Sequence, residues 1–363
     1  MRVGVVTPWD IADERAWSGV VKPMVEALGR RMEIIPFLTH DVADAALDRA
    51  LCRLLDGRGG RRYLVGHSLA TGLTRARLLE RRLKRDPVDV VLGVAASQDL
   101  ALARIEAAVV QVADTSFSAL QDFYPLYTNL HGLTRWQGRR LAGRASRRAA
   151  HTLAATEWAR QAIIRDETVA PGTISVARFG PAIAPGEPFD RAGLTGPARL
   201  LVVASDWERK GGDRAVALWQ ALVARGVAAS LTVVGAAPET LPPGVRRVGK
   251  VNREEMAELY RTHHVLVELA RGNTAGVTLT DAAAFGLPVL AADVGGVGSI
   301  VADGLTGRLV AGADQPAALA AVLELLDPSA WSRWSAAALG RSRSLLNWDH
   351  WAGEAEAQLV NAA

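Results

Sequence analysis

Asn273 and Asp281 have seven residues between them in a stretch that runs from a polar loop into a helix of small residues, ARGNTAGVTLTDAAAFGLPVLAADVGG. The first N–H groups of a helix lack partners inside the helix and, together with the helix dipole, attract phosphate. We expect the N–H groups of Gly276, Val277 and Thr278 to be free to bind a diphosphate. Asp281, about one turn into the helix, would accept two hydrogen bonds from a ribose diol. The alternative for Asp281 is a solvated position on the helix surface.

Lys210 adds a cation at a second glycine-containing turn. It stands directly before Gly211 and Gly212 in SDWERKGGDRAVALWQAL, and Arg209 precedes it. When a sugar leaves a diphosphate, negative charge grows on the phosphate oxygens, and a fixed cation stabilises that charge. Lys210 is therefore a candidate catalytic residue, with a solvated loop charge as the alternative.

Two sets of about six strands are expected to position these residues. Short β-branched segments alternate with helical stretches along the chain, which predicts right-handed βαβ units and parallel sheets. A chain of 363 residues is too long for one ordinary core. The fold class is therefore α/β, with two Rossmann-like domains whose parallel sheets face each other across a cleft. The expected strands are residues 3–7, 33–37, 89–93, 108–112, 152–155, 174–179, 199–204, 230–235, 247–251, 264–269, 288–292 and 307–310.

Pro and Gly cluster between Pro181 and Pro197 in a stretch without a clear period, so we expect a linker there. HHVLVELA is one of the strands of the second set, and Asn273 lies in the loop at its carboxyl end. Ligands of open α/β sheets bind outside the carboxyl ends of the strands. The loop that carries Asn273 is therefore a candidate ligand site.

Composition favours a globular protein, since 49% of the residues are hydrophobic and the mean hydropathy is +0.11. No apolar run approaches the roughly 20 residues that a transmembrane helix needs, and the N-terminus MRVGVVTPWD leads directly into a strand. We therefore expect a cytoplasmic protein without an export signal. Cys52 is the single cysteine, which excludes a disulfide framework and a Cys-based zinc cluster, so no structural metal is expected.

Positive charge is concentrated in the first half, with 26 Lys and Arg against 19 Asp and Glu up to Phe179 and 16 against 19 after it. A solvated helix face is one interpretation of its densest stretch, and peripheral contact with an anionic membrane or a phosphate-bearing acceptor is the other. Nucleic acid is not expected, because no nucleic-acid-binding motif accompanies the charge. The stretch contains Arg135, Arg139, Arg140, Arg144, Arg147 and Arg148.

The second half resembles the retaining glycosyltransferases of family 4, which have the two-domain GT-B fold. Their donor loop and helix read Glu, seven residues, Glu, then Ala-x-x-Gly-x-Pro-Val and Gly-Gly. Here Asn273 and Asp281 stand at the two acidic positions, and Gly286 and Pro288 fix the register. SDWERKGG resembles the Lys-Gly segment whose basic side chain meets the donor diphosphate in this family, which implies that role for Lys210.

The resemblance implies further donor-binding residues. Arg209 neighbours the diphosphate lysine, and Ala275 belongs to the glycine-containing loop. The base is expected near Lys250 and Val251, where the backbone reads it. Asn273 would contact the transferred sugar as a catalytic residue.

In the first domain the resemblance is looser. AWSGVVKPMVEAL resembles the N-terminal glycine loop, in which Gly19 lets the backbone approach the donor diphosphate and the acceptor closely, with Trp17 and Ser18 on the acceptor side. Asp114, in QVADTSFSAL, is expected to contact a sugar or acceptor hydroxyl as a catalytic residue, with a helix cap as the alternative. ATEWAR resembles the Ser-x-Trp segment, which places Thr156 on the acceptor side.

The resemblance covers essentially the whole chain. It implies an acceptor-binding domain at residues 1–183 and a donor-binding domain at 184–345. The segment 346–363, which contains NWDHWAGEAEAQLV, would be a helix that crosses back to the first domain.

Three positions depart from the family pattern. Asn273 is neutral where the family has Glu, Ser299 stands where many members have Glu, and Ala204 with Ser205 replaces a common Gly-Arg pair. An amide both donates and accepts hydrogen bonds, so the sugar pocket should differ. We expect an unusual donor sugar, with loss of catalysis as the alternative.

The expected function is that of a retaining, metal-independent glycosyltransferase without a cofactor. It would move a sugar from a nucleotide diphosphate sugar, with UDP or GDP favoured, to a hydroxyl of a sugar, a lipid-linked molecule or a small molecule. The alternatives are a non-catalytic binder of sugar nucleotides and a pseudo-glycosyltransferase that couples two non-sugar rings.

A remote alternative is an α/β-hydrolase, because GHSLATG places Ser68 in a sequence close to a nucleophile elbow. The elbow requires a strand, a strained turn and a helix. Ala70 stands where the second glycine should be, so a helix or loop position is expected for Ser68.

Overall fold

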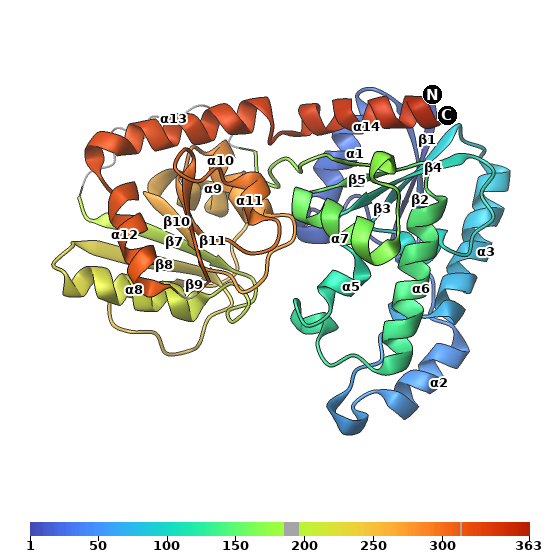
Figure 1. The fold of residues 1–363 in the computed structure, drawn as a ribbon, viewed down its shortest axis with the longest axis horizontal. Coiled ribbons are helices and arrows are strands. Elements are labelled where there is room, and N and C mark those ends of the chain that lie inside the picture. Colours follow the sequence, from blue (N-terminus) through green and yellow to red (C-terminus); the bar gives the residue numbers. More distant parts are fainter. Residues whose placement is uncertain (185–195, 313) are drawn as a thin grey trace. The chain divides into compact units, whose positions relative to one another are not determined.

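The computed structural model describes residues 1–184, 196–312 and 314–363, which fall into two compact units (Figure 1). The first unit comprises Met1–Arg178 and Trp348–Ala363, and the second comprises Phe179–Asn347. The linker expected between Pro181 and Pro197 falls largely on residues 185–195, which lie outside the described residues.

The first unit is built on a parallel six-stranded sheet with the order β2-β1-β3-β4-β5-β6. The chain leaves β1 toward β2 on one side and returns to place β3 on the other, so the switch in direction lies between β1 and β3. The strands are β1 (Arg2–Thr7), β2 (Glu33–Leu38), β3 (Val90–Val94), β4 (Ala108–Ala113), β5 (His151–Ala154) and β6 (Ile174–Val176).

The second unit repeats this arrangement with the order β12-β11-β10-β7-β8-β9, again all parallel. The switch in direction lies between β7 and β10. The strands are β7 (Ala198–Ala204), β8 (Ala229–Gly235), β9 (Val245–Val248), β10 (Val265–Glu268), β11 (Val289–Ala292) and β12 (Gly307–Val310).

Helices cover both faces of each sheet. In β7, alternate residues pack into different apolar clusters, one on each face. Leu200 and Val202 belong to one cluster and Leu201 to the other, so both faces of the sheet are buried, as parallel sheets require. The helices of the first unit are α1 (Val21–Gly29), α2 (Ala46–Leu55), α3 (Leu69–Arg85), α4 (Ser97–Leu100), α5 (Phe117–Leu120), α6 (Gly132–Arg148), α7 (Glu157–Glu167) and α14 (Trp348–Ala362). Those of the second are α8 (Gly212–Ala224), α9 (Arg253–Thr262), α10 (Val277–Ala284), α11 (Val297–Ile300), α12 (Gln315–Leu325) and α13 (Pro328–Ser344).

The C-terminal helix α14 belongs to the first unit although its sequence follows the second. Trp351 is fully buried, and ion pairs of 2.6 Å join Arg30 to Asp349 and Arg31 to Glu356. The chain therefore returns to the first unit at Trp348.

All twelve expected strands are present, and the α/β fold class with two parallel sheets is confirmed. The largest shift is in β9, which was expected at residues 247–251 and is found at Val245–Val248. None of the described helices is long and apolar enough to cross a membrane.

Candidate functional site

The candidate site lies at the switch point of the second sheet. β7 and β10 are neighbours there, with Leu200 opposite Val265 and Leu201 opposite Leu266. The loop after β7 carries Lys210, and the loop after β10 leads into α10. Because ligands of such sheets bind outside the carboxyl ends of the strands at this point, the two loops form the expected kind of site.

Glycine at position 211 allows the two loops to touch. Gly211 has φ +68°, and a Cβ there would lie 2.0 Å from the carbonyl oxygen of Leu269. Arg209 stabilises the contact between the loops with two hydrogen bonds. Its guanidinium donates to the carbonyl of Gly272 over 3.0 Å, and its backbone carbonyl accepts from the N–H of Arg271 over 2.7 Å. These contacts set Lys210 against the end of β10.

Glu268, the last residue of β10, is the centre of the site. One carboxylate oxygen accepts from the Lys210 ammonium over 2.9 Å, and the other accepts from the Asn273 side-chain amide. The side chains of Lys210 and Glu268 are only 8% and 3% exposed. The lysine also lies 3.5 Å from the Thr278 hydroxyl. The expected residues Lys210 and Asn273 therefore meet at a carboxylate that sequence reasoning missed, and Thr278 lies beside the lysine.

The start of α10 differs from the expectation in one respect. The N–H of Gly276 is not free, because it donates to the side-chain oxygen of Asn273 over 2.9 Å. Within the part of the chain that the structure describes, the N–H groups of Val277 and Thr278 make no hydrogen bond. Two N–H groups, rather than three, are therefore available to an anion at this helix end.

Asp281 is buried in α10, so its alternative as a solvated surface residue is wrong. Burial raises the pKa of the Asp281 carboxyl to about 7, against the opposing effect of the hydrogen bonds that it accepts. It accepts from the N–H of Ile183 over 3.0 Å and from the Tyr260 hydroxyl over 3.4 Å. Its binding of a ribose diol stays a prediction.

Other expected donor residues of the second unit also lie in loops that follow its strands. Ala275 is buried in the loop before α10. Lys250, exposed, and Val251, half-buried, follow β9, which lies two strands from β7 in the sheet. Their contact with a nucleotide base stays a prediction.

The glycine loop of the first unit has an unusual backbone. Trp17, Ser18 and Gly19 follow one another with φ of +46°, +63° and +84°. Positive φ is costly for residues with a side chain and is found at functional sites held by their surroundings. The Trp17 ring stacks on Trp9 with 5.5 Å between the ring centroids. The loop follows β1 and therefore lies at the switch point of the first sheet.

Asp114 and Thr156 also lie at carboxyl ends of strands of the first unit. The helix-cap alternative for Asp114 is wrong, because Ser116 caps α5. Burial, with the Asp114 charge as a smaller cause, raises the pKa of Tyr127 to about 12. Thr156 itself is a cap, since its hydroxyl accepts from the N–H of Ala159 over 3.1 Å. Contact of either residue with an acceptor stays a prediction.

Ser68 does not stand on a nucleophile elbow. Val65–His67 is a turn of 3-10 helix, and Ser68 is fully buried as the cap of α3. Its hydroxyl donates to the Asp48 carboxylate and accepts from the N–H of Thr71 over 3.1 Å. No strained turn exposes its oxygen, so the hydrolase alternative is wrong.

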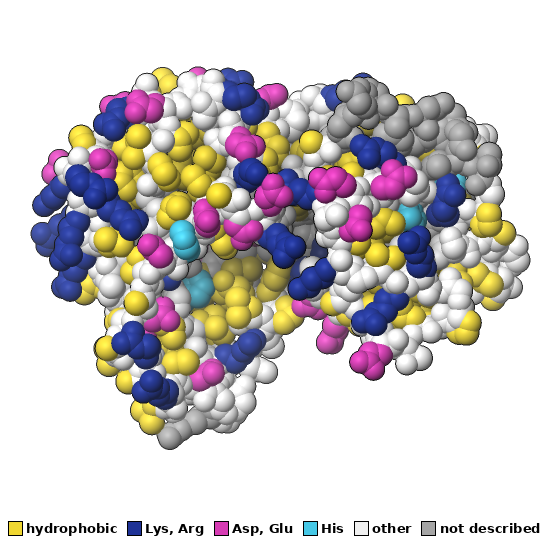
Figure 2. All heavy atoms as spheres, turned by 180° about the vertical axis from the view of Figure 1, so that it is seen from behind, with side chains coloured by type: hydrophobic (Ala, Val, Ile, Leu, Met, Phe, Trp, Pro, Cys, Tyr) yellow, Lys and Arg dark blue, Asp and Glu magenta, His cyan; other side chains and the backbone are white. Residues whose placement is uncertain are grey.

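Basic side chains of the first unit occupy two helices. On α6 part of the charge is used internally, because Arg144 and Arg148 both donate to the carbonyl of Ala101. Trp136 is 54% exposed on the same helix, with Arg140 over its ring. Figure 2 shows further Lys and Arg side chains gathered along one edge of the first unit over α3, which sequence reasoning did not single out.

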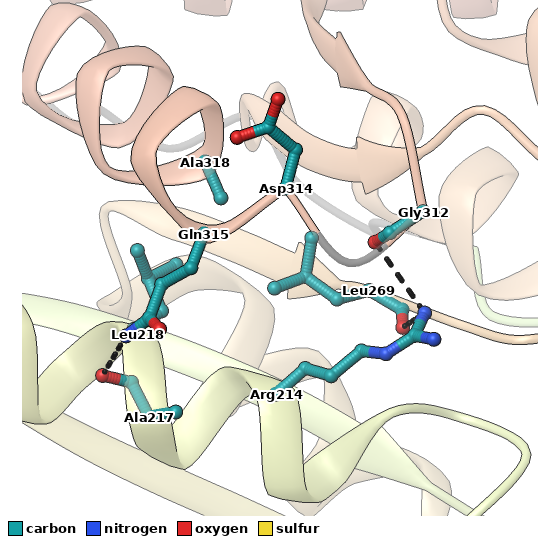
Figure 3. Close-up of a pocket in the computed structure, with 8 residues that line it drawn as sticks. All are labelled: Arg214, Ala217, Leu218, Leu269, Gly312, Asp314, Gln315 and Ala318. Atoms are coloured by element: carbon teal, nitrogen blue, oxygen red, sulfur yellow. Dashed lines mark hydrogen bonds between the residues drawn. The ribbon is translucent and has the colours of Figure 1, made fainter.

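A small cavity between α8 and α12 does not coincide with the candidate site. Its volume is about 90 Å³, below the roughly 300–1,000 Å³ of small-molecule sites. Figure 3 shows Arg214 reaching across it toward the carbonyls of Leu269 and Gly312, at 3.3 and 3.4 Å. In the described part of the chain, no group of three or more His, Cys, Asp or Glu is arranged to hold a metal ion.

The segment that contains the candidate site matches a known family model. Residues 197–327 match the family model described as glycosyl transferases group 1. A D-inositol 3-phosphate glycosyltransferase of Streptomyces avermitilis is 41% identical over 114 residues, which is 31% of this chain and 24% of that protein. The chain thus spans about a quarter of the length of this relative.

Solved structures resemble the whole chain. Sucrose-phosphate synthase from Thermosynechococcus elongatus has a TM-score of 0.74 at 17% identity, with all of both chains covered. HepE of Anabaena, solved in complex with UDP-glucose, has a TM-score of 0.69 at 15% identity, covering 99% of this chain and 100% of that one. The second unit therefore contains a glycosyl transferases group 1 domain, and the chain has the GT-B fold of glycosyltransferases.

Proposed function

We propose that this protein is a retaining, metal-independent glycosyltransferase of family 4 that moves a sugar from a nucleotide diphosphate sugar to an acceptor hydroxyl. The observation that carries the proposal is the position of Lys210. Its ammonium is nearly buried at the sheet's switch point, beside a helix start with the N–H groups of Val277 and Thr278 open. A cation and free N–H groups in one place suit a diphosphate.

Lys210 and the start of α10 act on the leaving group. The bond between the sugar carbon and the diphosphate oxygen breaks, and the acceptor oxygen bonds to that carbon on the same face. The acceptor proton passes to the departing phosphate, so the step requires no separate protein base. The protein contributes position and electrostatic stabilisation, which together supply much of the catalysis in such sites.

The other donor contacts follow the expected pattern. Asp281 holds the ribose, Asn273 reads the transferred sugar, and Arg209 adds charge near the diphosphate. The backbone near Lys250 and Val251 reads the base, with UDP or GDP favoured. Asp281 binds a ribose diol only after its carboxylate exchanges the Tyr260 hydroxyl or the Ile183 N–H for the sugar.

The first unit binds the acceptor. Trp17, Ser18 and Gly19 form the loop at its switch point, with Asp114 and Thr156 at neighbouring strand ends. The named relative acts on an inositol phosphate, and an acceptor of this kind, bearing phosphate, suits the basic first unit.

Peripheral contact with an anionic membrane through α6 is part of this proposal. The exposed Trp136 beside Arg140 is typical of a surface that inserts an aromatic ring at the lipid headgroups. Binding to vesicles with anionic lipid should then fall steeply with salt and with Arg140→Gln. Absence of binding at low salt would leave α6 as a solvated face.

Transfer itself is tested by incubating the protein with UDP-glucose, GDP-mannose and other sugar nucleotides, with and without EDTA, and following nucleotide release and product by mass spectrometry. Turnover in EDTA with retained anomeric configuration supports the proposal. Lys210→Ala should lower kcat by about 10²-fold or more. Nucleotide binding without any turnover across an acceptor panel would favour the non-catalytic binder.

A further inference from the structure

Glu268 is unexplained by the donor roles above, although it contacts two of the residues that carry them. It lies five residues before Asn273, outside the two motif positions at Asn273 and Asp281. A single charged side chain at the end of a buried strand is costly unless it is paired. Its partner Lys210 is 58 positions away in the sequence.

We propose that Glu268 is a positioning residue that holds Lys210 and Asn273 in place before the donor arrives, and that the donor diphosphate then competes with it for the lysine. The inference rests on the proposed function of this site. It assigns the nucleotide affinity of the protein, in part, to a residue that touches neither the sugar nor the phosphate.

The burial of the pair is the first step of the argument. With exposures of 8% and 3%, neither charge is screened by water as a surface pair would be. Among the described residues, Thr278 is the other polar contact of the lysine, and a neutral hydroxyl at 3.5 Å does not neutralise the ammonium charge. In the ligand-free protein, Glu268 is therefore the group that balances the Lys210 charge.

Because Glu268 compensates the charge of Lys210, it also weakens diphosphate binding. A diphosphate that approaches Lys210 meets a site whose net charge is already cancelled, and it gains less than it would from an unpaired cation. As the sugar leaves, the phosphate charge grows and the lysine interaction strengthens. The arrangement thus moves stabilisation from the bound donor toward the transition state, which favours kcat over tight binding.

The second oxygen of Glu268 controls the orientation of Asn273. It accepts from the amide nitrogen, so the amide oxygen faces the N–H of Gly276. Lys210 and Asn273 donate to different oxygens of Glu268, so a glutamine in the same place would turn its NH2 group toward one of them. Two donors that face each other make no hydrogen bond.

The test compares Glu268→Gln with wild type and with Glu324→Gln. The control removes the same charge in the same unit, from an exposed pair with Arg308. Calorimetry with UDP and GDP gives the affinity, and donor kinetics separate KM from kcat. Glu268→Gln should bind the preferred diphosphate at least about tenfold more tightly, as expected when a competing buried charge is removed. Its kcat should fall, and the control should match wild type in both.

A double variant, Lys210→Met with Glu268→Gln, shows whether the effect passes through the lysine. Neutral replacement of both partners of a buried pair is well tolerated, and the double variant should bind the diphosphate more weakly than wild type. If Glu268→Gln alone does not fold but the double variant does, the lysine requires Glu268, as proposed.

Equal or weaker diphosphate binding by folded Glu268→Gln would overturn the inference, as would failure of both variants to fold. Failure of the wild type to bind any nucleotide would instead remove the proposed function itself.

Discussion

Two helix starts in this protein carry sequences that resemble ligand-binding elements, and they are built in opposite ways. GHSLATG leads into α3 of the first unit, and GNTAGVT leads into α10 of the second. Both helices begin after a polar loop, and both have a buried carboxylate from another element beside them. The comparison separates a structural helix start from one that can receive a ligand.

At α3 the carboxylate of Asp48 satisfies only neutral donors. It accepts from the hydroxyls of Tyr63 and Thr71 over 2.9 and 2.7 Å, from the N–H of Thr71 over 2.8 Å, and from Ser68. Asp48 is 1% exposed. In the first turn of α3 the N–H of Leu69 donates to Gln137 and the N–H of Thr71 donates to Asp48, so among the first three N–H groups, within the described residues, that of Ala70 alone makes no hydrogen bond. An incoming anion would therefore find one open N–H group beside a buried negative charge.

At α10 the carboxylate of Glu268 lies against a lysine and an amide instead. Asn273 occupies only the N–H of Gly276, and the next two N–H groups stay open. A helix dipole is common to both ends, so the dipole alone does not make a site. The difference lies in which groups already satisfy the donors and whether a cation is present.

The largest effect on stability is expected from a substitution beside α3. Asp48→Ala leaves three buried hydroxyl groups without their acceptor, while the N–H of Thr71 keeps its bond to Ser68. The substitution should lower the free energy of unfolding by about 3–5 kcal/mol. Thermal and urea denaturation measure it. Asp349→Ala, which removes an exposed ion pair with Arg30, serves as the control and should cost less than about 1 kcal/mol. If both variants lose the same free energy of unfolding, the buried hydrogen bonds of Asp48 do not stabilise the start of α3 as argued.

The stability of the folded protein is expected to depend on pH through Asp281 in α10. The pKa of Asp281 is raised from 3.8 to about 7 in the folded protein. Below pH 4 the carboxyl is neutral in both states, and its contribution to stability is fully present. As pH rises from 4 to 7 the unfolded state ionises first, so stability falls. Asp281→Asn removes this loss and should be more stable than wild type above pH 7 by on the order of 2–4 kcal/mol.

Denaturation of both proteins between pH 4 and pH 8 tests this expectation. The gap between their melting temperatures should widen with pH. Parallel curves would mean that Asp281 is ionised at all these pH values. Asp281→Asn should also lower nucleotide affinity if the carboxylate holds the ribose.

A smaller effect is expected from the backbone at the start of α10. Gly276 has φ +68°, and a Cβ there would lie 3.0 Å from Ile300. Gly276→Ala should cost about 1–2 kcal/mol and weaken nucleotide binding. Gly340→Ala is the matched control, since its Cβ meets nothing within 4 Å in α13. If both variants keep their stability and affinity, the position of the α10 start does not depend on this glycine.

The smallest effect on affinity is expected from Asn273→Glu. The substitution restores the family's acidic residue beside Glu268, so donor preference should change while free UDP or GDP affinity changes by less than about tenfold. Competition between sugar nucleotides measures the preference. Equal loss for every donor would indicate damage to the site rather than altered recognition.

The sequence predicted the sheets well because β-branched strands alternate with helices in a regular order. It also placed Lys210 and Asn273 in loops that follow strands of the second set, and the structure adds that these strands, β7 and β10, are neighbours. It did not reveal Glu268, because the pairing joins positions 58 residues apart. The available signal was a lone acid at the end of HHVLVELA, directly before the loop.

Side-chain conformation explains the remaining differences. Asn273 turns its oxygen back onto Gly276, which no spacing rule reveals. Asp281 is buried because α10 is covered from Leu279 to Ala284, where every residue is buried. Local sequence indicated where donors and acceptors stand, and tertiary packing decided which of them remain open.

The central claim is that Lys210 and the start of α10 bind a nucleoside diphosphate. The most direct test is a calorimetric and thermal-shift panel of UDP, GDP, ADP and dTDP, with and without Mg²⁺, on wild type and Lys210→Ala. We expect one diphosphate to raise the melting temperature independently of Mg²⁺, and Lys210→Ala to reduce that shift. If no diphosphate stabilises the wild type, or if Lys210→Ala binds as well as wild type, the claim is contradicted.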